Sequence, residues 1–202
     1  MFDSHAHKGD ISFQNGLVCT SSPDEAPLGF RFKSIGLLPV SKNEEIDRLE
    51  EYAKEGYHIG EIGLDKRYPD IDKQIFLFSR ALMIAKKYNR FVSIHIVGYQ
   101  ELAYDLIKES QVDNFLIHGY TGSKEMAERF SSIGGLISIN EKAKKTKNFE
   151  SLLSLPFITE TDMPMSAEEN KKLSDWNLYL SKILDRDVAH ESEERIMERL
   201  NG

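Results

Sequence analysis

The sequence predicts an α/β fold, a (β/α)8 barrel of the TIM type in an abbreviated form. Short apolar runs rich in β-branched residues alternate with segments of helical periodicity, a pattern typical of parallel strands joined by helices. Eight such runs occur, which matches the strand number of the barrel. No linker or internal repeat divides the 202 residues, so we expect a single domain over residues 1–202.

The eight expected strands are short apolar runs that end near turn residues. They cover residues 1–5, 17–20, 30–38, 59–64, 91–96, 114–118, 135–139 and 157–160. Two of the expected helices open with the capping-box pattern, Ser41 with Glu44 and Ser166 with Glu169. The helices before the C-terminal region are expected at 41–56, 71–88, 100–109 and 124–132, followed by one that begins at Ser166.

The shortage of residues falls early in the chain. About ten residues separate the first expected strand from the second, and the second from the third, whereas a full crossover needs at least ten to twelve. Neither gap shows a convincing helix. We therefore predict that one or two outer helices are missing there. We also expect a partner subunit to cover the exposed barrel wall, which would make the protein a homodimer.

The charge balance limits the classes of partner. The chain has 26 Lys and Arg against 33 Asp and Glu, a formal net charge of −7. A protein that coats long nucleic acid is normally basic on at least one face, so the composition disfavours that role. A small phosphate substrate or a strand end remains compatible, because bound metal ions can supply local positive charge.

The composition also indicates a compartment. Cys19 is the only cysteine, so the chain forms no internal disulfide. No apolar stretch approaches the roughly 18 residues of a membrane span, and the first residues lack a signal-peptide pattern. We expect a soluble protein of the reducing cytoplasm with no membrane partner.

Six metal-binding side chains follow five different expected strands. His5 and His7 lie two residues apart, so both imidazoles face one side of a strand. Because the carboxyl ends of barrel strands meet at one rim, side chains at those ends should converge there. The full set is His5, His7, Glu61, His95, His118 and Asp162.

Five motifs carry a resemblance to a known family. They are Asp-Ser-His-Ala-His at 3–7, Gly-Glu-Ile-Gly-Leu-Asp at 60–65, Ser-Ile-His at 93–95, His-Gly-Tyr-Thr-Gly-Ser at 118–123 and Glu-Thr-Asp-Met-Pro at 160–164. In this order they resemble the TatD family of metal-dependent hydrolases, within the amidohydrolase-like barrel superfamily. The resemblance implies two divalent metal ions. His5, His7 and Asp162 would hold one ion, His95 and His118 the other, and Glu61 would bridge them.

The donor types agree with this assignment. Mixed imidazole and carboxylate ligands suit Zn, Mn, Fe or Ni better than Ca, and Mg stays among the candidates. Two ions about 3.5–4 Å apart can activate a water and polarise a phosphoryl oxygen. We expect Asp162 and Glu61 to be catalytic, with Asp162 orienting the water and taking its proton. Glu160 either orients a histidine ligand or lies on the surface as an ordinary carboxylate.

Some features of the family are missing. Leu38 stands where the family usually has a histidine, and Val97 stands where an arginine is common. Beyond Pro164 the family's Arg-Asn-Glu-Pro segment is not recognisable. These changes would remove substrate contacts while the metal ligands stay complete. Hydrolysis is therefore better supported than specificity for DNA.

Basic residues near the expected rim offer replacements. Arg67 follows the Glu61 strand, and Lys142, Lys144, Lys145 and Lys147 follow the seventh strand. We expect Arg67, Lys144 and Lys147 to contact substrate, although a solvated loop would explain the lysines equally well. Asp65 fits its motif or caps a loop, and His58 is expected at the far end of the barrel.

The sequence thus predicts a dinuclear metal-dependent hydrolase that cleaves phosphodiesters, trimming DNA ends or single-stranded DNA. One alternative keeps the metal chemistry but acts on a small ester, amide or phosphomonoester. Another is a barrel that binds metal without catalysis.

Overall fold

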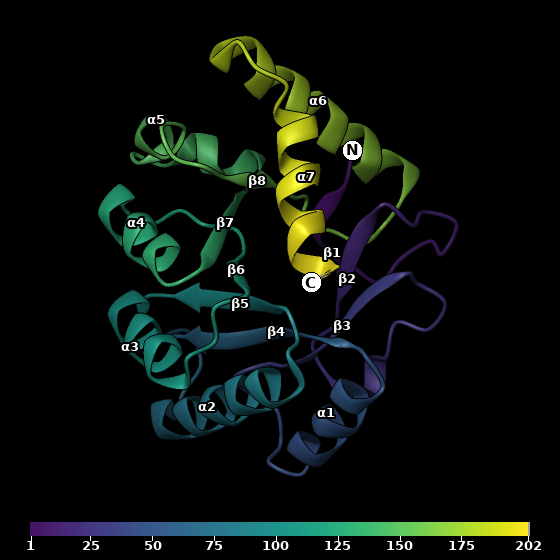
Figure 1. Ribbon diagram of the computed structural model, residues 1–202, viewed down its shortest axis with the longest axis vertical. Coiled ribbons are helices and arrows are strands. Elements are labelled where there is room, and N and C mark those ends of the chain that lie inside the picture. Colours follow the sequence, from purple (N-terminus) through teal and green to yellow (C-terminus); the bar gives the residue numbers. More distant parts are fainter. Residues whose placement is uncertain (202) are drawn as a thin grey trace.

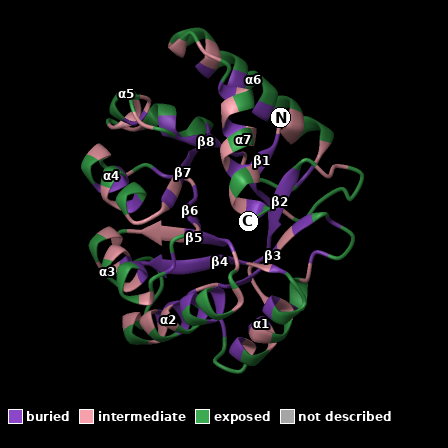
Figure 2. Cartoon of the chain, in the orientation of Figure 1, coloured by how far each residue is buried: buried purple, intermediate pink, exposed green. Residues whose placement is uncertain are grey.

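Eight parallel strands form one sheet in sequence order, which confirms the predicted (β/α)8 barrel. The structure is a computed structural model and describes residues 1–201 (Figure 1). The strands are β1 (Asp3–His7), β2 (Gly16–Cys19), β3 (Phe32–Leu37), β4 (His58–Asp65), β5 (Val92–Val97), β6 (Phe115–Ile117), β7 (Gly135–Ile139) and β8 (Ile158–Thr159). Most of their residues are buried (Figure 2).

The barrel closes through the segment that follows β8. The amide of Asp162 donates to the carbonyl of His5 at 3.1 Å, and the amide of His7 donates to Met163 at 2.9 Å. The amide of Met165 then donates back to His7 at 3.0 Å. These bonds extend β1 two residues beyond the predicted end at His5, so both histidines of the first motif belong to the strand.

Seven α-helices follow strands β3 to β8 among the described residues. They are α1 (Glu45–Lys54), α2 (Ile71–Tyr88), α3 (Gln100–Ser110), α4 (Lys124–Ser132), α5 (Phe149–Leu152), α6 (Ala167–Leu184) and α7 (Val188–Leu200). The Ser166 cap is confirmed, since its hydroxyl accepts from the Glu169 amide. The Ser41 capping box was wrong. Glu44 is the residue before α1, and the Glu45 carboxylate instead accepts from the Lys42 amide at 2.8 Å.

The early part of the barrel lacks outer helices, as predicted. Residues 8–15 are all described and form no helix, and between β2 and β3 the chain makes only the short 3-10 helix η1 (Pro23–Glu25). Figure 1 shows that loops without an α-helix connect β1 to β2 and β2 to β3. Phe13, Phe30 and Met165 from these loops and from the segment after β8 pack on the outer side chains Ala6 and Val18. The chain therefore covers much of this wall itself, and the homodimer stays a prediction.

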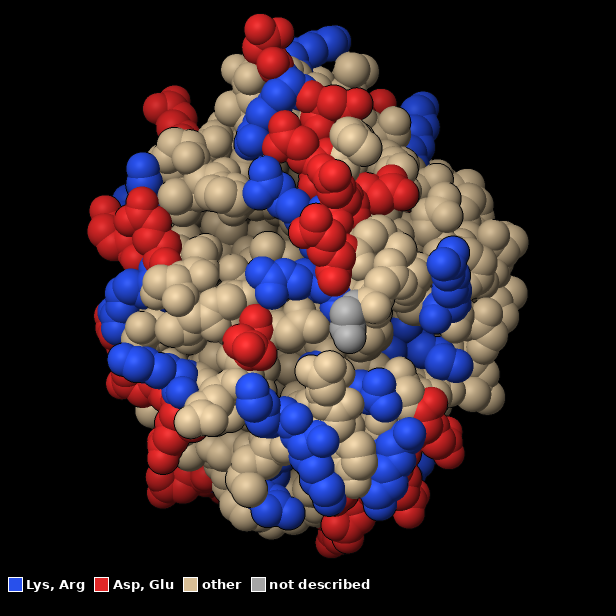
Figure 3. Space-filling model, viewed as in Figure 1, with Lys and Arg blue, Asp and Glu red and all other residues tan. Residues whose placement is uncertain are grey.

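Helix α7 closes the end of the barrel at which the strands begin. Ile196 and Leu200 pack in one buried cluster with Phe2, Leu17 and Leu116. In Figure 1 the helix crosses the middle of the ring of strands. Acidic residues gather over α6 and α7 on this face, with lysine and arginine side chains spread around them (Figure 3). The metal ligands lie at the opposite end of the strands.

Among the helices of residues 1–201, none combines the length and the apolar character needed to cross a bilayer.

Replacing Ile196 by alanine is expected to lower the free energy of unfolding by about 2–5 kcal/mol, because it removes a fully buried side chain between α7 and the barrel interior. Urea unfolding measures the change. Leu178→Ala, on the exposed face of α6, serves as the control and should stay within about 0.5 kcal/mol of the parent. Equal effects of the two changes would contradict the role of α7.

His58 is expected to make the fold sensitive to acid. Burial, helped by the charge of Arg90, lowers the pKa of His58 to about 4. The unfolded chain takes up this proton near pH 6.5 but the folded chain does not. The free energy of unfolding should therefore fall as the pH drops from about 6.5 to 4, by at most about 1.4 kcal/mol for each pH unit.

Chemical denaturation at several pH values tests this sensitivity. His58→Phe should flatten the pH dependence in that interval, whereas His190→Gln, at an exposed position of α7, should leave it unchanged. An unchanged slope in His58→Phe would show that other groups cause the acid sensitivity.

Candidate metal centre

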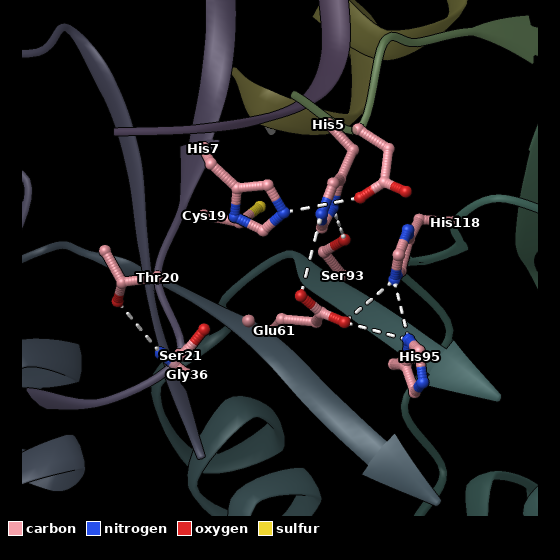
Figure 4. A network of polar contacts seen from close by, with 12 residues as sticks. His5, His7, Cys19, Thr20, Ser21, Gly36, Glu61, Ser93, His95 and His118 are labelled. Atoms are coloured by element: carbon pink, nitrogen blue, oxygen red, sulfur yellow. Dashed lines mark hydrogen bonds and ion pairs between the residues drawn. The ribbon is translucent and has the colours of Figure 1, made fainter. Parts of the chain in front are cut away.

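The structure brings all six predicted ligands together at the carboxyl ends of the strands. His5 and His7 come from β1, Glu61 from β4 and His95 from β5. His118 directly follows β6, and Asp162 lies three residues after β8. The remaining strands supply none of the six. Figure 4 shows the four imidazoles arranged around the Glu61 carboxylate.

Glu61, His95 and His118 converge on one point. Glu61 Oε1 lies 2.9 Å from His95 Nδ1 and 3.1 Å from His118 Nε2, and the two nitrogens are 3.2 Å apart. Donor atoms that share an ion at about 2.0–2.1 Å are separated by similar distances. A single cation could therefore replace all three contacts.

The second half of the site involves the other oxygen of Glu61. His5 Nε2 lies 3.9 Å from Glu61 Oε2, and His7 Nε2 lies 3.3 Å from Asp162 Oδ1. The donor atoms of His5, His7 and Glu61 all lie within 4.8 Å of one another, as do those of His5, His118 and Asp162. Glu61 thus faces both halves of the site.

Buried polar atoms without partners support a cation here. Among the described residues, His5 Nε2 and His118 Nδ1 are buried and accept or donate no hydrogen bond. The rings of His5 and His118 stack with centroids 3.9 Å apart. An unpaired imidazole nitrogen is costly to bury in the barrel interior. For His5 Nε2, which points toward Glu61, a bound metal ion would satisfy the atom, so the residues fit the expected group.

The charges of the site also favour cations. Burial alone would raise the pKa of Glu61, but hydrogen bonds from His118 and His95 hold that pKa well below its usual range. Burial alone would likewise raise the pKa of Asp162, but hydrogen bonds from His7 and Lys142 keep that pKa below its usual range. Both carboxylates are therefore ionised at neutral pH. Burial and the neighbouring His118 together lower the pKa of His5, so its ring is available as a neutral ligand.

Each inner histidine is held by a partner outside the ligand set. Ser93 Oγ is hydrogen bonded to His5 Nδ1 at 2.7 Å, and Asp65 Oδ2 lies 3.0 Å from His95 Nε2. Such contacts fix the orientation of an imidazole ligand. Ser93 was not among the predicted site residues, although it stands two residues before His95 and so faces the same side of β5. Asp65 accepts a hydrogen bond from the Arg67 amide in the following loop and also contacts His95. It therefore has both predicted roles, as a loop cap and as part of the motif at the site.

Glu160 lies inside the barrel rather than on the surface. Its carboxylate accepts hydrogen bonds from Ser138 Oγ and from Asn140 Nδ2, and the latter is 3.0 Å long. Glu160 Oε1 lies 3.8 Å from His118 Nδ1. Because Glu160 is only 1% exposed, the alternative that it is an ordinary surface carboxylate was wrong. The position is compatible with orienting His118.

The predicted substrate contacts are placed less uniformly. Lys142 Nζ lies 2.9 Å from Asp162 Oδ2, so this lysine reaches the site. Lys144 instead lies over the rings of Trp176 and Tyr179. Arg67 pairs with Asp65 at the rim, with most of its side chain exposed. Lys147 is exposed beyond the 3-10 helix η2 (Glu141–Lys145). The structure therefore singles out Lys142 among the lysines.

A family profile described as "TatD related DNase" matches residues 24–194 of the chain. The chain belongs to the TatD-related DNase family. The match extends beyond Pro164, where the sequence motifs no longer indicated the family, and reaches into α7. Helices α6 and α7 are thus largely part of the family's domain.

Relatives in sequence carry a general description. An uncharacterized metal-dependent hydrolase of Methanocaldococcus jannaschii is 32% identical over 110 residues, covering 52% of this chain and 43% of that protein. The uncharacterized metal-dependent hydrolase YjjV of Escherichia coli is 31% identical over 150 residues, covering 66% of this chain and 58% of YjjV. The chain spans about half the length of the curated relatives it matches. These matches agree with a metal-dependent hydrolase of the TatD family.

Solved structures share the fold. The crystal structure of YjjV superposes with a TM-score of 0.80 at 18% identity, over 98% of this chain and 95% of that one. A TatD-family hydrolase from Entamoeba histolytica gives 0.75 at 15% identity, over 100% and 98%. A phosphotriesterase homology protein from Escherichia coli, complexed with phosphate in its active site, gives 0.63 at 10% identity, over 96% and 97%.

Asp65→Asn is expected to weaken metal binding by about 10- to 100-fold, because His95 loses the carboxylate that orients it. Competition with a coloured chelator, with Zn²⁺ or Mn²⁺ as the probe, measures the affinity. Asp113→Asn changes an exposed carboxylate far from the site and should leave the affinity unchanged. If Asp65→Asn bound metal as tightly as the parent, Asp65 would not position His95.

Proposed function

We propose that the protein is a dinuclear metal-dependent hydrolase that cleaves phosphodiester bonds and trims DNA ends. The observation that carries this proposal is the gathering of six donors in three overlapping groups: His95, His118 and Glu61; His5, His7 and Glu61; and His5, His118 and Asp162. We assign His95, His118 and one oxygen of Glu61 to one ion, and His5, His7, Asp162 and the other oxygen of Glu61 to a second. Glu61 is the bridging ligand in this reading.

The chain's own residues divide the chemistry. Two bound divalent ions, drawn from Zn, Mn, Mg, Fe and Ni, would activate a water and stabilise the charge that develops on the phosphoryl group. Asp162 is the proposed proton acceptor, since it is ionised and partly open to solvent at the mouth of the site. Ser93 and Asp65 hold the imidazoles of His5 and His95 in place, and Glu160, 3.8 Å from His118 Nδ1, is the proposed orienting group for His118.

Several observations support a phosphodiester substrate. The family's description is that of a DNase, and the related phosphotriesterase homology protein holds phosphate in its active site. Lys142 and Arg67 add positive charge at the rim, where a phosphate could approach. The net charge of −7 favours contact with a strand end over contact along a duplex. A cytoplasmic location stays part of this proposal.

A second candidate keeps the centre but changes the substrate. Leu38 and Val97 leave apolar side chains after β3 and at the end of β5, where the family often carries cationic or imidazole groups. This loss favours a small ester, amide or phosphomonoester. Hydrolysis of lactones or amides without any cleavage of phosphodiesters would favour this candidate. A barrel that binds metal but turns over none of these substrates would favour the non-catalytic alternative.

Asp162→Asn is expected to lower kcat on a labelled single-stranded oligonucleotide by about 10²- to 10⁴-fold, because the amide cannot take the proton of the attacking water. Urea unfolding should show that the variant stays folded. Asp105→Asn, an exposed change on α3, is the matched control and should keep full activity. Undiminished turnover in folded Asp162→Asn would remove Asp162 from the mechanism.

Elemental analysis of protein purified without chelator is expected to find about two divalent ions in each chain, because two donor sets share Glu61. Glu61→Gln should lose at least one of them. A single ion in the fully active parent would contradict the dinuclear proposal.

A further inference from the structure

A cavity of about 190 Å³ adjoins the metal centre. It lies between η2, the residues that follow β8, and helix α6. Met163, Leu173 and Trp176 form apolar walls, and Asn140 and Glu160 supply polar atoms. Thr161, two lysines (Lys142 and Lys172) and two further carboxylates (Glu141 and Glu169) complete the lining. The cavity is distinct from the set of six ligands, none of which lines it.

Two contacts connect this cavity to the metal centre. Lys142 Nζ lies 2.9 Å from Asp162 Oδ2, so one lysine contacts both the cavity and the proposed proton acceptor. Glu160, which lines the cavity, also reaches the metal centre, since its Oε1 lies 3.8 Å from His118 Nδ1. A substrate with its reacting group at the metal centre could therefore place an adjacent group in the cavity.

Lys142 is the basic group best suited to bind an anion here. Lys172 also lines the cavity, but Glu168 and Glu169 hold its ammonium at 2.8 and 2.7 Å. Lys142 has one acidic partner, Asp162, and about two-thirds of its side chain is exposed. An anionic group at the edge of the cavity can thus share Lys142 without breaking a buried pair.

The size and lining of the cavity indicate what fits inside. Sites for drug-sized ligands have volumes of roughly 300–1,000 Å³, so this smaller cavity suits one compact group. Its apolar walls, together with the buried polar groups of Asn140 and Glu160, suit a planar ring that also forms hydrogen bonds.

We propose that the cavity binds one nucleoside unit of the substrate, next to the reacting phosphate, and that Lys142 contacts this phosphate. The proposal rests on the proposed phosphodiesterase function and assigns the terminal nucleoside of its substrate to this cavity. Recognition of a single terminal unit agrees with trimming at a strand end. Lys142 then selects for phosphate, and the walls select for the ring.

The single tryptophan of the chain makes the proposal testable by binding alone. Trp176 is the only tryptophan and lines the cavity, so a ring that enters should change its fluorescence. Thymidine 5′-monophosphate, thymidine and inorganic phosphate are titrated separately into the protein as purified. We expect a saturable change with the nucleotide, a weaker response with thymidine and none with phosphate. No saturable response to the nucleotide would overturn the proposal.

Two variants separate the roles of charge and shape. Lys142→Met should weaken nucleotide binding by about 10- to 100-fold, the range of a charge-assisted hydrogen bond. Met163→Phe narrows the cavity at an exposed position and should weaken the binding of the nucleotide and of thymidine, because both place a ring in the cavity. Lys171→Met, on the exposed face of α6, is the charge control and should bind like the parent. Equal weakening in Lys142→Met and Lys171→Met would overturn the role of Lys142.

Parallel assays of oligonucleotide cleavage distinguish this inference from the proposed function. Cleavage without any fluorescence response to the nucleotide would overturn the cavity and leave the phosphodiesterase in place. A saturable response in a protein that cleaves no phosphodiester would support the cavity as a nucleotide site and overturn the phosphodiesterase.

Discussion

The polar side chains at the carboxyl ends of the strands are arranged around the ionised carboxylate of Glu61. Glu61 is buried within an apolar strand, where an isolated charge would cost several kcal/mol. Histidines from three other strand ends surround it. Ser93 and Asp65 contact the other ring nitrogens of His5 and His95, and Glu160 lies 3.8 Å from His118 Nδ1. The polar residues at the strand ends thus form a connected network that starts at one charge.

Much of this arrangement follows from the sequence alone. Strands of parallel barrels end at one rim, so residues at strand ends such as His95 and His118 could be placed together without coordinates. The spacing of His5 and His7 fixed their common face in the same way. The early gaps were too short for helices, and residues 8–15 indeed contain none among the described chain.

Other features depend on tertiary contacts that a linear pattern does not contain. The Ser41 box failed because the Glu45 carboxylate satisfies the loop before α1 instead. Four lysines follow β7, and the sequence pattern gave no reason to predict which of them reaches the metal centre. The turn of η2 directs Lys142 to Asp162 and Lys144 to Trp176, and that choice depends on three-dimensional packing. Phe13, Phe30 and Met165 cover Ala6 and Val18 from within the chain, a packing that the sequence pattern did not indicate, and the homodimer stays a prediction.

The seam between β1 and the segment after β8 has a consequence for assembly. His7 and Asp162 are 155 residues apart in sequence, and their contact forms only when the first strand meets the last. The donors of the Glu61, His95 and His118 set come from three consecutive strands, so that set requires no such closure. Completing the long-range contact costs more loop entropy, which makes the seam a natural place for local opening. A metal ion in the half beside the seam would lose ligands whenever the seam opened, whereas an ion in the other half would keep three donors on strands that stay paired with one another.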